Sequence, residues 1–310
     1  MEVRHTAIKC GIKLEQRRDI VSRQAKLKRD WELISHISGA AMRAVMVAVL
    51  IALPSLMVAQ GNQESSQIIL LIAFVAGILV FAEYSAQSPT IIEFRYAAPY
   101  NRIRFLGLAL GVLILSSIVR GAGDPGSLTL LLMDLGRILG ASLDFPYSPV
   151  RQVLLLVPAH TSMELADFVK IAAGYSYLIS LTMIVIFALL VRLLGWPVRR
   201  GAFNVWMNLP LFDPTRGGDV VQRLHREAGL NISLGFVLPF LLPVGVALLD
   251  GVIEPASLLH PHRSIWVISA WAFLPASLVM RGIAMHRVAE LITAKRRRVY
   301  AQAEDALQTV

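Results

Sequence analysis

A chain of 310 residues in which 55% are hydrophobic and only 16% are charged lacks the composition of a soluble globular protein, where about 25% of residues are charged. A net charge of +9 would suit nucleic acid in a soluble protein, but in so apolar a chain the anionic inner leaflet of a membrane is the simpler partner. We therefore expect a lipid bilayer and no nucleic acid as partner, and the single cysteine, Cys10, excludes a disulfide within the chain.

The chain begins with a basic amphipathic segment, residues 1–37, which we place in the cytoplasm. It has no apolar core of the kind that a cleavable signal peptide needs. Acidic and basic residues are interleaved from about Leu14 to Leu33, and we expect a helix there.

Six apolar stretches follow, and each approaches the roughly 20 residues that a helix needs to cross a bilayer core. They make up a membrane domain, 38–280, with spans near 38–60, 67–84, 103–121, 170–196, 230–249 and 264–281. The clearest span contains Ile171 to Val191, a stretch without a single charge. A basic helical tail, 282–310, completes the chain.

Between the third and fourth spans lies an external stretch, 122–169, of which one segment is too apolar for a free loop. Its segment Ser127 to Leu143 is expected either to lie flat on the outer interface or to enter the membrane as a re-entrant pair with Val150–Val157. Thr161 to Glu164 has the pattern of a capping box, which predicts that a helix starts at Ser162.

The fifth span contains two prolines, Pro239 and Pro243, one helical turn apart. Each proline breaks a backbone hydrogen bond, and a carbonyl left without a donor in a membrane must find another. We therefore expect neighbouring helices to supply donors there. Before this span, Asp219 is predicted to cap a short amphipathic helix, with Gly229 loosening its junction with the span.

Basic residues set the predicted orientation. With both ends inside, 25 of the 30 Lys and Arg residues lie on the cytoplasmic side, as the positive-inside rule requires. We predict an all-α, polytopic membrane helical bundle with about six transmembrane helices, both termini inside and interfacial amphipathic helices. The expected location is the inner (plasma) membrane of a bacterium, and a homo-oligomer is left open.

One candidate for chemistry is an external metal site. His160 and Glu164 are spaced i,i+4, and His260 and His262 lie in another external loop; imidazoles and a carboxylate are ligands for zinc. The capping box alone explains Glu164, and solvated loop histidines explain the others. The spacing matches no established metal motif, so no cofactor is expected.

The second cytoplasmic loop, 197–229, is predicted to dock a protein partner. Its turn sequence DPTRGGD and the helix that follows carry the charged residues Asp213, Arg216, Asp219, Arg223 and Arg226. The run Lys295, Arg296, Arg297 and Arg298 in the tail is predicted to bind anionic lipid. Two further segments look motif-like without matching a known family: Glu93 to Phe105 and Leu209 to Leu224.

These features favour a membrane component without a catalytic centre: an accessory, assembly or scaffold protein that docks partners on its cytoplasmic face. The alternative is an exporter-like permease subunit driven by a separate ATPase, with the 197–229 loop as its coupling element. Ser180 and other polar groups could then line a neutral path, since the spans hold no charge near their centres. A membrane-embedded metal-dependent enzyme is the third hypothesis.

Overall fold

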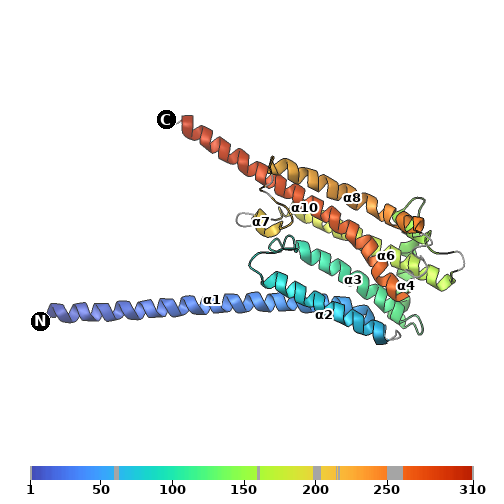
Figure 1. Cartoon of the computed structure of the whole chain (residues 1–310), viewed down its shortest axis with the longest axis horizontal. Helices are drawn as coiled ribbons and strands as arrows, with labels where there is room; N and C mark the ends of the chain where they lie inside the picture. Colours follow the sequence, from blue (N-terminus) through green and yellow to red (C-terminus); the bar gives the residue numbers. More distant parts are fainter. Residues whose placement is uncertain are drawn as a thin grey trace.

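The chain folds into a bundle of long helices with two helical arms (Figure 1). The computed structural model describes residues 2–58, 63–158, 161–197, 204–213, 215, 217–249 and 261–308. Of these, it describes only the backbone at 2–25, 27, 29, 32, 63–66, 206, 261 and 262. Within these ranges the regular structure is helical, as predicted.

The long helices run alternately in opposite directions. In chain order the helices are α1 (Glu2–Met57), α2 (Gln63–Ser85), α3 (Tyr100–Arg120), α4 (Ser127–Leu143), α5 (Pro149–Leu154), α6 (Met163–Leu193), α7 (Val205–Asn208), α8 (Val220–Leu248) and α10 (Pro261–Gln308). Both chain termini lie at one end of the bundle, together with α7 and the 86–99 loop (Figure 1). We call this the terminal end, and the opposite end, which holds α4, the far end.

Six helices in the described part of the chain are long and apolar enough to cross a membrane. Their apolar parts are Leu33–Met57, Gln67–Ser85, Tyr100–Arg120, Met163–Leu193, Val220–Leu248 and Arg263–Gln308. Each of them corresponds to one predicted span, so the helical fold class and the six apolar helices are confirmed.

Three predicted helix boundaries are wrong. The N-terminal helix does not end near Leu33 but continues into the first apolar helix as α1. The helix that begins after Asp219 runs through Gly229 to Leu248 as α8, and the basic tail continues α10 without a break. A change from charged to apolar side chains alters what surrounds a helix and leaves its backbone hydrogen bonds intact, so composition alone does not end it.

Glycines set the closest helix contacts. A Cβ atom added to Gly174 of α6 would lie 2.7 Å from the backbone nitrogen of Gly140 in α4. One added to Gly235 of α8 would lie 2.5 Å from the carbonyl oxygen of Pro275 in α10. Small residues let helix backbones approach in this way where side chains would hold them apart. The apolar helix α4 therefore packs along α6.

Two local predictions can be compared with hydrogen bonds. The helix start is confirmed to within one residue: Ser162, and not Thr161, is the N-cap, its hydroxyl accepts from the backbone N–H of Leu165 at 3.3 Å, and α6 begins at Met163. In α8, Pro243 cannot donate to the carbonyl of Pro239, four residues earlier. The buried indole N–H of Trp271 in α10 donates to that carbonyl at 2.9 Å. A neighbouring helix thus supplies the donor that the proline removes.

Candidate functional site

At the terminal end, two segments far apart in the sequence are joined through one asparagine. The backbone N–H of Phe94 donates to the Asn208 carbonyl at 2.6 Å, and the N–H of Tyr96 donates to the Asn208 side-chain oxygen at 3.2 Å. The Asn208 side-chain amide in turn donates to the carbonyl of Asn204 at 2.9 Å. The 86–99 loop is therefore fixed to α7. These are the neighbourhoods of the two motif-like segments of the sequence.

Four aromatic rings fill the space beneath this junction. The ring of Trp196 lies 5.5 Å from that of Phe94 and 5.0 Å from that of Phe187, and Tyr100 lies 4.6 Å from Phe94. The Trp196 indole N–H donates to the carbonyl of Ala97 at 3.1 Å. Phe94 has a φ of 53°, a conformation that bulky residues adopt only where the surroundings enforce it. Such enforced backbone marks this junction as a candidate site.

A buried ion pair locks the junction to α10. The guanidinium of Arg281 donates to both carboxylate oxygens of Glu93, at 2.6 and 2.8 Å. Glu93 is 9% exposed and the Arg281 side chain 20% exposed. A two-bond guanidinium–carboxylate contact fixes orientation as well as distance. The pair therefore holds the 86–99 loop in one position against α10.

A second ion pair ties α10 to the start of α8. Arg296 lies 2.7 Å from the Asp219 carboxylate, and both side chains are partly exposed. The hydrogen bond from Arg296 holds the pKa of Asp219 below its ordinary value. Because the folded-state pKa is depressed, the contact is present above the ordinary pKa of an aspartate and is lost as the pH falls through the folded-state value.

The residues predicted to dock a partner are largely engaged within the chain. Asp219 pairs with Arg296, while Arg223 donates to the Asp213 carbonyl at 2.7 Å and covers the ring of Phe212. Arg226 is exposed on α8, and Arg216 lies outside the described residues. Their docking role stays a prediction. In the structure, Asp213, Asp219 and Arg223 also hold the loop together.

The predicted lipid-binding residues 295–298 are exposed on the arm of α10. Successive helical residues point about 100° apart, so four consecutive side chains surround the helix and cannot all face one flat surface. Lipid binding by this run stays a prediction as well.

Of the four predicted metal ligands, only Glu164 has a described side chain. Glu164 is exposed in the first turn of α6, where the capping prediction places it, and the side chain of His262 is outside the described set. His160 and His260 also lie outside the described residues. Within the described part of the chain, no group of three His, Cys, Asp or Glu side chains could hold a metal ion. The external site stays a prediction.

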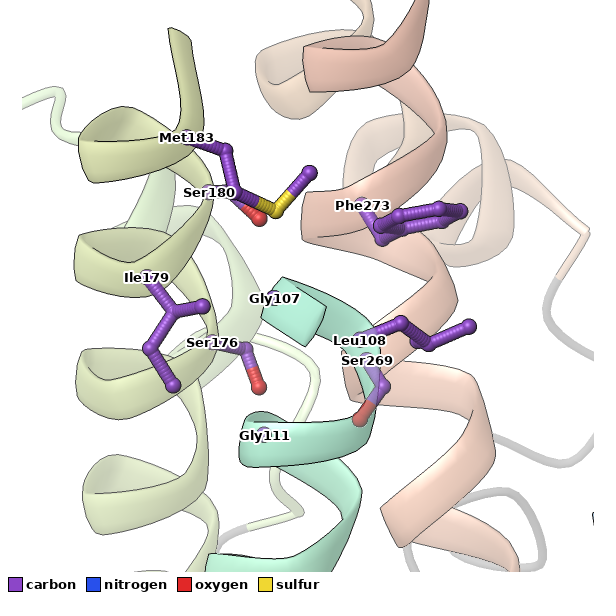
Figure 2. Close-up of a pocket in the computed structure, with 9 residues that line it drawn as sticks. All are labelled: Gly107, Leu108, Gly111, Ser176, Ile179, Ser180, Met183, Ser269 and Phe273. Carbon is purple, nitrogen blue, oxygen red and sulfur yellow. The ribbon is translucent and has the colours of Figure 1, made fainter. Parts of the chain in front are cut away.

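A small cavity lined by hydroxyl groups lies between α3, α6 and α10. Ser176 and Ser269 project from α6 and α10 into the gap beside Gly107 and Gly111 of α3, and Ser180 lies one turn along from Ser176 (Figure 2). The space open to the centre of a water molecule is about 10 Å³, which is room for one water.

Two of these hydroxyls lack partners. Ser176 is 5% exposed and Ser269 4% exposed, and neither hydroxyl makes a hydrogen bond within the described part of the chain. A buried hydroxyl without a partner costs free energy, and a cavity of this size beside it fits a bridging water. Only Ser180 of this group was expected from the sequence. Serines in apolar helices can bond to their own backbone, so the sequence did not distinguish Ser176 and Ser269.

Comparisons with known proteins found no match to this chain among protein-family models, curated proteins or solved structures.

Proposed function

We propose that this chain is a multi-pass membrane scaffold that docks a protein partner with the two helical arms of its terminal end, and that this end faces the cytoplasm. The observation that carries the proposal is the pair of long helices that continue past the apolar bundle on the same side (Figure 1). The predicted distribution of Lys and Arg supports the orientation.

The arms are longer than anchoring requires. At about 1.5 Å per residue, the 48 residues of α10 extend about 72 Å, of which a bilayer core takes about 30 Å. About 40 Å of α10 therefore lies beyond the core. In α1, the residues that precede Leu33 add about 45 Å on the same side.

Where their side chains are described, the arms have a surface that is open to a partner. The described side chains of α10 from 294 to 308 are exposed, including Val299 at 53%, Tyr300 at 72% and Leu307 at 79%. On α1, Trp31 is 69% exposed. Exposed aromatic and aliphatic side chains among basic residues suit a protein interface, where aromatic residues and arginine are enriched.

The base of the α10 arm is held in place. Glu93 fixes Arg281 where the arm leaves the bundle, and Asp219 holds Arg296 further along. Between them, the Arg287 side chain donates to the Trp196 carbonyl at 3.2 Å. A preorganised arm loses less conformational freedom when it binds, which favours a protein partner over loose contact with lipid.

A photocrosslinking experiment in intact membranes tests this proposal. A photoreactive residue in place of Tyr300 should give a discrete protein adduct. The same residue in place of Phe236, which is 70% exposed on the apolar part of α8, should give none and serves as control. Reversing the charge of residues 295–298 should abolish the adduct while membrane insertion persists. Adducts to lipid alone at both positions would contradict the proposal.

The hydroxyl-lined cavity favours the alternative function, a permease subunit with a separate ATPase. Three serines, Ser176, Ser180 and Ser269, line this cavity between otherwise apolar helices. Room for one water is less than a solute path requires, so this support is weaker than that of the arms. Co-purification of a stoichiometric ATPase, with loss of ATP hydrolysis on disruption of the Asp219–Arg296 pair, would favour the permease.

A further inference from the structure

Two histidines from different helices meet at the terminal end. The Nδ1 atom of His225 in α8 lies 3.1 Å from the Nδ1 atom of His286 in α10. Their ring centroids are 4.8 Å apart, and the rings are inclined by 66°. Both side chains are exposed, so an ion can reach them from solution.

The ring separation can be compared with two ways of joining these nitrogens. A straight N–H···N hydrogen bond of 3.1 Å would place the ring centroids about 5.4 Å apart. Two imidazole nitrogens about 2.0–2.1 Å from one metal ion and 3.1 Å from each other subtend about 98° at the metal, which puts the centroids about 4.8 Å apart. The observed separation of 4.8 Å matches the second arrangement.

A carboxylate is placed where it supports metal binding. The Oε1 atom of Glu290 lies 3.5 Å from Nε2 of His286, on the side of the ring away from His225. The other oxygen of Glu290 accepts from Arg287 at 2.8 Å, which orients the carboxylate. A proton on Nε2 that faces a carboxylate leaves the Nδ1 lone pair free, which is the usual arrangement of histidines that bind metals.

We propose that His225 and His286 form a two-histidine site for a divalent transition metal ion such as Zn²⁺, with Glu290 orienting His286. Within the described residues no third His, Cys, Asp or Glu completes the site, so its remaining positions are open to water or to a ligand from outside the chain. The ion would join α8 to α10 on the same end as the Asp219–Arg296 pair. This site is separate from the external one predicted from His160 and Glu164.

Zinc titration of the full-length protein in detergent micelles tests the site, with a chromogenic chelator as competitor. The background variant carries His160→Ala and His262→Ala, which removes the predicted external site. We expect it to bind one Zn²⁺ per chain. His225→Ala or His286→Ala removes a ligand and should weaken binding more than Glu290→Gln, for which we expect a loss of about tenfold. His36→Ala, an exposed histidine on α1, is the matched control and should change nothing.

Thermal unfolding supplies a second readout. A ligand that binds only the folded state raises its stability by mass action, so Zn²⁺ should raise the melting temperature of the background variant and not that of the His286→Ala variant. Zinc binding of unchanged affinity in the His225→Ala variant, or a background variant that binds no zinc, would overturn the proposal.

Discussion

Replacing Arg281 by methionine tests whether the buried ion pair holds the terminal end together. Methionine keeps the apolar stem of the side chain and removes both N–H donors to Glu93, which lies 9% exposed. Breaking a buried ion pair by removing one partner costs about 3–5 kcal/mol, because the other charge stays buried. Arg281 is itself 20% exposed, so we expect about 3 kcal/mol, near the lower limit of that range.

The assay is equilibrium unfolding in detergent micelles, followed by tryptophan fluorescence. Arg137→Met is the matched control. It removes two ion pairs, with Asp134 and Asp167, but the Arg137 side chain is 45% exposed, and exposed pairs contribute at most about 1 kcal/mol each. Adding Glu93→Met to Arg281→Met should restore most of the lost stability, since an apolar pair can replace a buried ion pair. The reasoning fails if Arg281→Met costs no more than the control, or if the double variant is the least stable.

Three further tests, with five substitutions, probe the packing of the apolar helices. Gly174→Leu should destabilise the protein by about 1–3 kcal/mol, because its Cβ would lie 2.7 Å from the α4 backbone. Gly229→Ala should stabilise the protein by up to about 1 kcal/mol, because nothing lies within 4 Å of the added Cβ. Equal effects of the two changes on the free energy of unfolding would refute the glycine contact. If one water bridges the two hydroxyls, Ser176→Ala and Ser269→Ala should each lower the free energy of unfolding by about 1 kcal/mol, and their effects should not add. Stabilisation by either change would show that no water is bound. Trp271→Phe should cost about 1–3 kcal/mol in the same assay by leaving a carbonyl of α8 without a donor, and a neutral effect would contradict that role.

Features that depend on local chemistry could be predicted from the sequence. The helix start at Ser162 follows from a hydroxyl that can bond to the N–H three residues later, and no distant part of the chain is involved. The need for a donor to the carbonyl of Pro239 followed from the position of Pro243 alone. The sequence did not show that Trp271 supplies this donor, because 32 residues and a loop separate Trp271 from Pro239.

The candidate site depends on contacts between distant segments and was not predicted. Glu93 and Arg281 are 188 residues apart, and neither has a local pattern that names the other. The segment that begins at Glu93 looked unusual because aromatic and basic residues are mixed within it, and that was the available signal. The sequence held no signal that His225 and His286 form a pair. Each is a single histidine on a charged stretch of helix, and only the packing of α8 on α10 brings the two together.

The unbroken course of α10 has a mechanical consequence. A helix that runs from the apolar bundle into the arm transmits a tilt at one end as a displacement at the other. With about 40 Å of helix beyond the length that a bilayer core would take, a tilt of about 10° would move the tip by about 7 Å. Two ion pairs, at Arg281 and Arg296, restrain that movement near its base. A partner that bound the tip of α10 would therefore act on the apolar helices through the length of the arm, and loss of either ion pair would loosen the restraint on it.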